Sequence, residues 1–339
     1  MEQVRLGQTG LKVSRICLGT MTYGDPKWRD WVLTEEASRP FIKRALEAGI
    51  TFFDTADIYS NGASEEVVGR ALKDFADKRE SYVLATKVFF PVDGRHGGLS
   101  RKHIMHAIDD SLRRLGTDYV DLWQVHGYDN LTPLEETLAA LDHAVTSGRV
   151  RYVGVSNFAG WQTARAAAWQ SAFPGRAPIV AAQMEYSLLE RGIERELLPA
   201  AAALGIGVLP WSPLGRGVLT GKYRNGRPLD SRAASEHFGP FVRTYLSPRG
   251  SSIVEAVVTA AGGLGVSPLE VALAWIRDRP GVVAPILGAR TAGQLQGALL
   301  SEELTLPVEI SGALDDVSAI EVGYPEREGT GEGPQPEAY

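Results

Sequence analysis

Short apolar segments alternate with amphipathic segments along most of this 339-residue chain, and this alternation restricts the fold more than any other feature. Most apolar segments are continuous hydrophobic runs, which is typical of strands buried on both faces. Strand–helix alternation predicts parallel strands, and eight such units predict a closed (β/α)8 barrel, the TIM-barrel class of α/β fold. The expected strands are residues 15–19, 50–54, 81–87, 119–126, 150–157, 179–186, 206–212 and 282–288, and the clearest helices are 35–49, 64–76 with Ser64 as its N-cap, 100–116 and 133–148.

A single barrel domain is expected to span residues 1–325. A doubly wound sheet is the alternative, but no glycine-rich dinucleotide fingerprint follows the first strand. The opening stretch "VRLGQTGLKVSR", residues 4–15, is expected to form a small N-terminal hairpin that closes the bottom of the barrel. Residues 221–250 are rich in Gly, Pro, Ser and Arg and are expected to form a long functional loop. Residues 326–339 are expected to be a disordered tail.

The composition argues against several classes of protein. Apolar residues make up 44% and charged residues 22% of the chain, and the net charge of −6 provides no basic field for nucleic acid or anionic lipid. Cys17 is the single cysteine, so no internal disulfide can form. The N-terminus lacks the apolar stretch of a signal peptide, and no apolar run approaches the ~20 residues that span a bilayer. We therefore expect a cytoplasmic protein without nucleic-acid or membrane partners, and its oligomeric state, a homo-oligomer included, stays open.

Ionisable side chains follow three consecutive predicted strands. Asp54, Lys87 and His126 end the strands "ITFFD", "SYVLATK" and "YVDLWQVH", and Tyr59 lies in the loop after the first of these. Each has an ordinary explanation by itself, as a helix cap, a solvated charge, a packed imidazole or a surface phenol. Active sites of (β/α)8 barrels lie at the C-terminal ends of the strands, so the four are expected to share one cavity. Clustered Cys and His residues at metal-ligand spacing are lacking, so no metal site is expected.

These four residue types suit proton donation to a carbonyl oxygen. A tyrosine has a pKa of about 10 in water, which is high for a proton donor near neutrality. An ammonium group close to Tyr59 favours the phenolate, so Lys87 is expected to lower the pKa of Tyr59, with Asp54 as the partner of the lysine. His126 would orient the carbonyl oxygen. Such a site also needs a hydride source on the other side of the carbonyl.

With these residues in place, the chain resembles the aldo-keto reductases over nearly its whole length. Asp54, Tyr59, Lys87 and His126 match the family tetrad, and the motifs occur in family order: "GTMTYG" (19–24), "DTADIY" (54–59), "ATK" (85–87), "VGVSNF" (153–158), "WSPLGRG" (211–217) and "ILGAR" (286–290). The similarity is greatest to bacterial members and to potassium-channel β-subunits. It implies a barrel reductase that uses NADPH, bound in an extended form without a Rossmann fold, to reduce an aldehyde or ketone, with Tyr59 as the proton donor.

The resemblance also implies the cofactor contacts. Ser156, Asn157 and Gln183 would bind the nicotinamide carboxamide, Trp211 would stack on the ring, and Arg290 would bind the 2′-phosphate. The other implied cofactor residues are Gly19, Thr20, Met21, Ser212, Leu214, Gly215, Gly217, Gly288 and Gln294, with Arg216 and Lys222 as rival phosphate partners on the pyrophosphate side. The family usually carries a Glu-Asn pair that contacts the adenine, but this chain has Gly297 and Ala298 there. The loop 221–250 is expected to fold over the pyrophosphate.

Aromatic residues in the loops beyond the strands suggest an apolar pocket for a carbonyl substrate. They are Tyr23, Trp28, Trp31, Phe89, Phe90 and Tyr128. Two other classes stay open: a regulatory or channel-associated subunit that binds the cofactor with little turnover, and a metal-dependent aldolase or isomerase on the same barrel.

Overall fold

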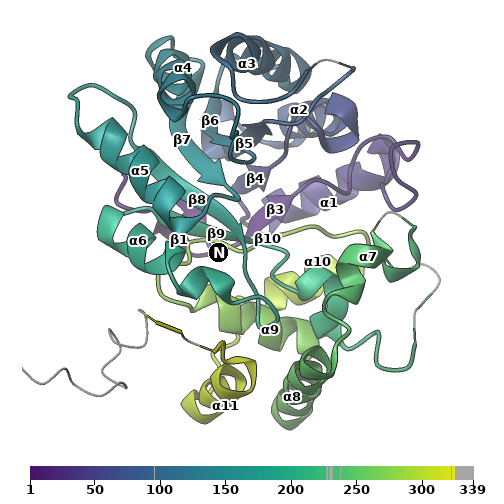
Figure 1. Cartoon of the computed structure of the whole chain (residues 1–339). Coiled ribbons are helices and arrows are strands. Elements are labelled where there is room, and N and C mark those ends of the chain that lie inside the picture. Colours follow the sequence, from purple (N-terminus) through teal and green to yellow (C-terminus); the bar gives the residue numbers. More distant parts are fainter. Residues whose placement is uncertain (95, 227, 229–231, 237, 322, 325–339) are drawn as a thin grey trace, which may run out of the picture.

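The computed structural model describes residues 1–324 except 95, 227, 229–231, 237 and 322, so the tail expected at 326–339 lies outside the described residues (Figure 1). Eight parallel strands form a closed barrel in the order β10-β3-β4-β5-β6-β7-β8-β9, which confirms the (β/α)8 fold. The strands are β3 (Cys17–Gly19), β4 (Phe52–Asp54), β5 (Val83–Val88), β6 (Val120–Val125), β7 (Val150–Ser156), β8 (Ile179–Glu185), β9 (Gly207–Trp211) and β10 (Ile286–Leu287).

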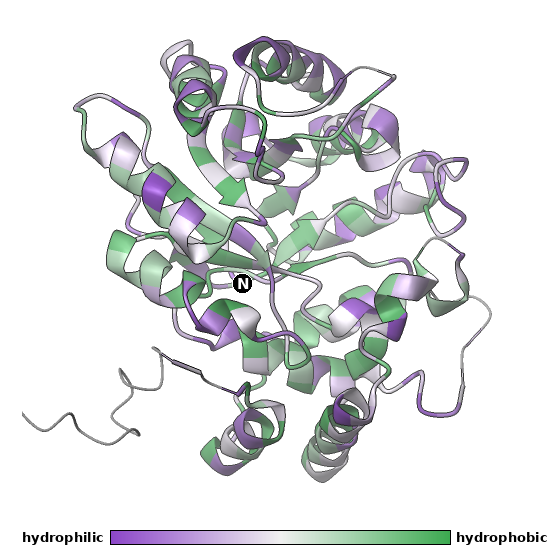
Figure 2. Cartoon of the chain, viewed as in Figure 1, coloured by the Kyte–Doolittle hydropathy of each residue, from purple (hydrophilic) through white to green (hydrophobic). Residues whose placement is uncertain are grey.

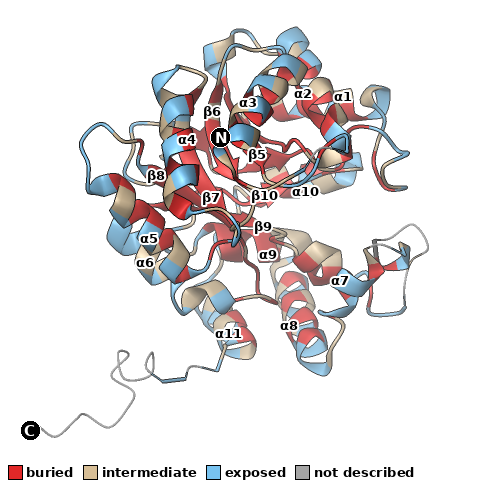
Figure 3. Ribbon diagram, turned by 45° about the horizontal axis from the view of Figure 1, so that its top comes forward, coloured by how far each residue is buried: buried red, intermediate tan, exposed pale blue. Residues whose placement is uncertain are grey.

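Amphipathic helices surround the barrel and turn their buried faces toward it, as Figure 3 shows in red, with the apolar strands at the centre in Figure 2. Helices α3, α4, α5 and α6 contact the strands, and their buried residues recur at helical spacing, so one face covers the barrel and the other meets solvent. The helices are α1 (Glu35–Glu47), α2 (Ala63–Phe75), α3 (Arg101–Leu115), α4 (Leu134–Thr146), α5 (Gly160–Ser171), α6 (Leu197–Leu204), α7 (Gly239–Arg243), α8 (Pro248–Leu264), α9 (Pro268–Arg277), α10 (Ala292–Leu300) and α11 (Val308–Ser318).

The predicted hairpin is present at the bottom of the barrel. β1 (Gln3–Arg5) pairs antiparallel with β2 (Lys12–Ser14), and the turn between them packs on the start of β9. Gly7 is needed there because its φ is +57° and an added Cβ would lie 2.5 Å from the carbonyl oxygen of Gly205. Leu6 and Cys17, both fully buried, belong to a separate apolar cluster at this end of the barrel, and Cys17 is a free thiol.

The expected strands and helices differ from the structure in three places. The segment 221–250 is not one long loop, because it contains a 3-10 turn (Arg232–Ala234), α7 and the beginning of α8. The last strand is only two residues long, whereas residues 282–288 were expected to be extended throughout. Helix α2 begins at Ala63 after Gly62, so Ser64 is not an N-cap; its buried hydroxyl instead donates to the carbonyl oxygen of Thr20, 2.9 Å away.

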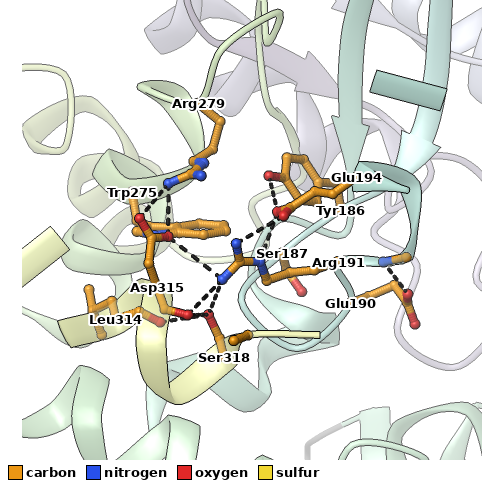
Figure 4. Close-up of polar contacts among 12 residues, drawn as sticks. Tyr186, Ser187, Glu190, Arg191, Glu194, Trp275, Arg279, Leu314, Asp315 and Ser318 are labelled. Carbon is orange, nitrogen blue, oxygen red and sulfur yellow. Dashed lines mark hydrogen bonds and ion pairs between the residues drawn. The ribbon is translucent and has the colours of Figure 1, made fainter. Parts of the chain in front are cut away.

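Two guanidinium groups, the buried Arg191 and the partly exposed Arg279, fasten the C-terminal helix α11 to the barrel (Figure 4). Arg191 donates to both carboxylate oxygens of Glu194, at 2.8 and 2.9 Å, and to the hydroxyl of Ser318 at 2.8 Å. Arg279 donates to both oxygens of Asp315 at 2.8 and 2.9 Å. These contacts join α11 to the residues that follow α9 and to the segment after β8.

Within the described part of the chain, no single helix has the length and apolar composition to cross a membrane. Helices α8 and α9 meet that criterion only as a pair, and they are bent by 102° relative to each other.

Candidate active site

Three of the four predicted ionisable residues come directly from the C-terminal ends of neighbouring strands. Asp54 is the last residue of β4, Lys87 lies one residue before the end of β5, and His126 follows β6. Tyr59 begins a 3-10 turn (Tyr59–Gly62) that leads into α2. The parallel strands place all four at one end of the barrel, as the sequence predicts.

A buried ammonium group connects three of these residues. Nζ of Lys87 donates to Oδ2 of Asp54 at 2.5 Å, to the carbonyl oxygen of Thr55 at 2.8 Å and to the phenol oxygen of Tyr59 at 3.3 Å. Lys87 is 0% and Asp54 2% exposed. All three hydrogens of the ammonium are therefore used, and one of them is directed at the phenol.

The second oxygen of Asp54 is held by two amides. Gln183, on β8, donates from Nε2 to Oδ1 at 2.9 Å, and Gln124, on β6, donates to the same oxygen at 3.4 Å. Gln124 was not predicted as a site residue, because a single polar residue within an apolar strand gives no motif signal. The carboxylate is thus fixed from both sides, which leaves it oriented toward Lys87.

Burial and nearby charge set the protonation of the site. Burial by itself would lower the pKa of Lys87, but Asp54 and Tyr59 together raise it, so the lysine stays an ammonium. Burial raises the pKa of Tyr59, and the opposing effect of Lys87 is smaller. Lys87 thus lowers the pKa of Tyr59 as expected, but burial raises that pKa more, so the net shift is upward. The phenol remains protonated, which is the form that a proton donor requires.

His126 is a neutral imidazole beside the phenol. Burial first, and then the charge of Lys87, hold the pKa of His126 well below its usual value of 6.5. Its ring centroid lies 5.8 Å from that of Tyr59, in an edge-on arrangement. The buried Nδ1 of His126 has no hydrogen-bond partner among the described residues. A neutral His126 can donate one hydrogen bond without adding charge to the site.

Left-handed backbone at non-glycine residues recurs around this end of the barrel. Five such residues lie in the turns that follow the strands: Ser60 (φ +50°), Asn61 (+51°), Asn157 (+57°), Ser212 (+52°) and Arg216 (+58°). Such conformations are rare and cluster at functional sites, where the surrounding structure holds them. Asn157 is held by its side chain, which donates to the carbonyl oxygen of His126 at 2.9 Å and accepts from the indole nitrogen of Trp211 at 3.1 Å.

A cavity of about 490 Å³ extends from Asp54, Tyr59 and His126 to Arg290 at the start of α10. Most of the residues that the family resemblance implies for the cofactor line this cavity. They are Gly19, Thr20, Met21, Ser156, Asn157, Gln183, Trp211, Ser212, Leu214, Gly217, Gly288, Arg290 and Gln294. Gly215 does not line it, since it is buried under the side chain of Leu189.

Only two of the six predicted substrate residues, Trp28 and Phe90, line the cavity. The other four belong to the packing around it. Tyr23 is fully buried and donates to the carbonyl oxygen of Ala289 at 2.9 Å. Trp31 packs edge-on against Trp28 and Phe238, Phe89 against Phe90, and Tyr128 against Phe158 and Trp161. All six residues lie in loops after strands, so the sequence does not distinguish them. The side chains of these four do not line the cavity.

The cavity also has lining residues that were not predicted. These are Thr22, Ile58, Pro213, Thr220, Phe238, Phe241, Leu269, Leu273, Ile286 and Leu287. Thr22, Ile58, Pro213, Ile286 and Leu287 lie within the motifs already quoted, so their neighbours could have indicated them. Phe238, Phe241, Leu269 and Leu273 come from helical segments distant in sequence, and only the fold brings them to this cavity.

Arg216 joins the cavity wall to α7 and the residues after it. Its Nη2 donates to Glu185 at 2.8 Å, and its Nη1 donates to the carbonyl oxygen of Phe241 at 2.9 Å. Tyr245 donates to the other oxygen of Glu185 at 2.7 Å. Part of the 221–250 segment is thereby held at the mouth of the cavity. Arg216 is an alternative phosphate partner by the family resemblance. Its ion pair with Glu185 would have to be shared or broken for it to bind a phosphate.

The residues present fit an extended dinucleotide such as NADPH. The cavity is lined by Asp54, Tyr59 and His126 and also by the cationic residues Lys222 and Arg290. Gln294, in the first turn of α10, accepts from the backbone nitrogen of Arg290 at 2.7 Å. This contact fixes the turn before the helix, and helix N-termini favour phosphate groups. Ala298 also lines the cavity, where a small side chain leaves room but offers no polar contact to an adenine.

Among the residues that the structure describes, no group of three or more His, Cys, Asp or Glu side chains is arranged to hold a metal ion.

Comparison with known proteins places the chain in a family. Residues 15–319 match the aldo/keto reductase family, and the chain belongs to this family. It is 38% identical over 335 residues to versiconal hemiacetal acetate reductase of Aspergillus parasiticus, covering 91% of this chain and 94% of that protein. It is 40% identical over 330 residues to the uncharacterized oxidoreductase YrpG of Bacillus subtilis (94% and 96%). It is 34% identical over 331 residues to a "Probable voltage-gated potassium channel subunit beta" of Oryza sativa subsp. japonica (96% and 98%).

Proposed function

We propose that this oxidoreductase reduces an aldehyde or ketone to an alcohol with NADPH as the hydride donor. One observation carries the proposal: Lys87 binds both the carboxylate of Asp54 and the phenol of Tyr59, at one end of a cavity that reaches Arg290. This arrangement holds a protonated phenol where a carbonyl oxygen can be received. The names of relatives such as the Aspergillus reductase support the same reaction type.

In the proposed reaction, Tyr59 donates its phenolic proton to the carbonyl oxygen as negative charge develops there. When bound, NADPH supplies the hydride to the carbonyl carbon. The ammonium of Lys87, 3.3 Å from the phenol oxygen, stabilises the phenolate that forms. Neutral His126 donates a hydrogen bond that orients the carbonyl oxygen toward Tyr59. The proton and the hydride together convert the C=O group to CH–OH.

The cofactor preference rests on Arg290. Arg290 lines the same cavity as Asp54, Tyr59 and His126, and it directly precedes Thr291, the N-cap of α10. A guanidinium binds a phosphate through charge-assisted hydrogen bonds, whereas a ribose hydroxyl offers it no comparable charge. The 2′-phosphate of NADPH is therefore proposed to bind here, with Trp211 beside the nicotinamide and Ser156, Asn157 and Gln183 near its carboxamide.

The substrate is proposed to be an apolar carbonyl compound. Trp28, Ile58 and Phe90 line the cavity together with Tyr59 and His126. These side chains offer apolar and aromatic contact and carry no charge. They favour neutral, hydrophobic substrates over anionic ones.

A cofactor-binding regulatory subunit is the second candidate, because 34% identity to the channel β-subunit of Oryza extends over nearly the whole of both chains. Purified protein should be mixed with NADPH and a panel of aromatic and aliphatic carbonyls, and the loss of nicotinamide absorbance followed. A reductase consumes NADPH with several of them and does so in the presence of EDTA, which also removes a metal-dependent aldolase. Stoichiometric binding without turnover would favour the regulatory role.

Tyr59→Phe is the matched variant for this test. It should bind NADPH as before and lose about 10²–10⁴-fold in reduction rate, the range of general acid catalysis. Turnover near that of the original chain would remove Tyr59 from the mechanism.

A further inference from the structure

The turn that carries Tyr59 has a backbone that the chain does not adopt readily. Ser60, Asn61 and Gly62 all have positive φ, at +50°, +51° and +95°. Left-handed residues usually occur singly, and two of these three carry a Cβ. A turn of this kind persists only where the surrounding structure holds it in place. The position of the Tyr59 phenol therefore depends on whatever packs against residues 60–62.

Arg114, near the end of α3, packs against this turn. A Cβ built on Gly62 would lie 2.6 Å from Cδ and 2.8 Å from Nε of Arg114, so the arginine side chain rests directly on the glycine. Nε of Arg114 donates to Oε2 of Glu65 at 2.6 Å, and Nη2 donates to the hydroxyl of Ser111 at 3.3 Å. These contacts fix the arginine stem over the turn.

Glu65 connects the same arginine to the strand that carries Lys87. Its second oxygen, Oε1, accepts from the hydroxyl of Thr86 at 2.6 Å, and Thr86 immediately precedes Lys87 on β5. The Glu65 carboxylate thus binds Arg114, which packs against the Tyr59 turn, with one oxygen and Thr86, next to Lys87, with the other. The side chains of Glu65 and Arg114 are 0% and 9% exposed, so the pair is buried.

Helix packing alone does not require this ion pair. Helices α2 and α3 already touch at Gly69, where an added Cβ would lie 2.2 Å from the carbonyl oxygen of Leu115. A buried ion pair is also weak evidence for stability, because desolvation offsets much of its attraction. Asp57 is a third buried acid nearby, and burial and then the charge of Glu65 raise its pKa well above its usual value. The hydrogen bond that Arg114 donates to a carboxylate goes to Glu65.

We propose that Glu65 and Arg114 are positioning residues that set the distance between the Tyr59 phenol and the Lys87 ammonium. The proposal rests on the reductase function proposed above. The ion pair acts as a spacer: Arg114 supports the turn from one side, and Glu65 ties that support to Thr86. Neither side chain lines the cavity, so neither touches a substrate or cofactor.

The test is the double variant Glu65→Gln/Arg114→Met. It removes both charges together, which avoids leaving one buried charge unpaired, and the new amide can still accept from Thr86. We expect a folded protein with unchanged NADPH affinity and unchanged KM. We also expect kcat to fall on the order of 10- to 100-fold, as a small misplacement of a catalytic group does. A crystal structure should show the Tyr59–Lys87 distance increased beyond 3.5 Å, the limit of a hydrogen bond.

The control is Arg39→Met/Asp74→Asn. This pair joins α1 to α2 at 2.6 Å and lies away from the cavity, so kcat should not change. Unchanged kcat in the Glu65/Arg114 variant, or a loss that parallels NADPH affinity and thermal stability, would overturn the proposal. If the original chain turns over no carbonyl, the reductase function has failed instead. The Tyr59–Lys87 distance in the double variant then decides the positioning role, and a value still near 3.3 Å overturns it.

Discussion

Lys87 and Asp54 form an ion pair at the C-terminal mouth of the barrel, with the ammonium nitrogen 2.5 Å from the carboxylate oxygen and neither residue more than 2% exposed. The carboxylate does two things for the lysine. It supplies the charge that outweighs burial, and it fixes the direction in which the remaining ammonium hydrogens point. The protonation state of Lys87 is therefore a property of the pair.

Asp54→Asn should move the alkaline limb of the kcat profile to lower pH. Without the carboxylate, burial lowers the pKa of Lys87, so the ammonium is lost at a lower pH than before. As long as Lys87 is charged, the loss of the Asp54 carboxylate also removes one of the groups that raise the pKa of Tyr59. The measurement is kcat across neutral and alkaline pH. An alkaline limb that does not move would show that Asp54 does not control these groups.

Arg290→Ala should separate the two nicotinamide cofactors. A charge-assisted contact to the 2′-phosphate contributes about 1.5–3 kcal/mol, so the Kd for NADPH should rise by about 10- to 150-fold. The Kd for NADH should hardly change, since NADH lacks this phosphate. Both constants can be measured from quenching of tryptophan fluorescence. Equal weakening of the two cofactors, or of neither, would assign the 2′-phosphate elsewhere, with Lys222 as the next residue to change.

His126 should make folding stability depend on pH in the weakly acidic range. Its folded pKa lies well below the unfolded value of about 6.5, so the unfolded chain binds a proton that the folded chain refuses. The stabilisation is complete above about pH 6.5 and is lost as the pH falls below it, by up to about 1.4 kcal/mol per pH unit. The Tm of His126→Gln should fall less steeply from about pH 7 to about pH 5 than the Tm of the original chain. His106→Gln, at an exposed position of α3, is the control and should leave the slope unchanged.

Trp28→Ala should weaken the binding of aromatic substrates. Trp28 lines the cavity, so its removal takes away apolar contact and should raise KM for aromatic aldehydes more than for small aliphatic ones. Tyr128→Ala is a suitable control, because Tyr128 packs on Phe158 and Trp161 outside this cavity. If both variants change the aromatic preference equally, the substrate does not lie against Trp28.

The strands and the four ionisable residues were predictable because their signals are local. An apolar run that ends in a charge, as at "FFD" or "VLATK", predicts a strand and places its C-terminal end at or within one residue of that charge. Side-chain direction is not local: Trp28 and Tyr128 both lie in loops after strands, yet only one faces the cavity. Helix α7 was missed because a segment rich in Gly and Pro reads as a loop, and its packing on Arg216 is a tertiary contact.

The net shift of the Tyr59 pKa could not be predicted from the sequence either. The pKa of Tyr59 depends on how far burial exceeds the attraction of Lys87, and burial is known only once the fold is built. The sequence does not predict the left-handed turn after Tyr59 either, since Ser and Asn residues such as Ser60 and Asn61 are common in ordinary loops.

The barrel closes through its shortest strand. β10 contributes only two residue pairs to β3 and one to β9, whereas β6 and β7 share five. Amide hydrogens along this seam should exchange with solvent before those of β6, because fewer cross-strand bonds must open to release them. The wall between β9 and β3 is then the part of the barrel that opens earliest, and Trp211, Ile286 and Gly288, which face the cavity, lie along it. A molecule bound there would contact residues on both sides of this seam and would therefore stabilise the part of the barrel that opens most easily.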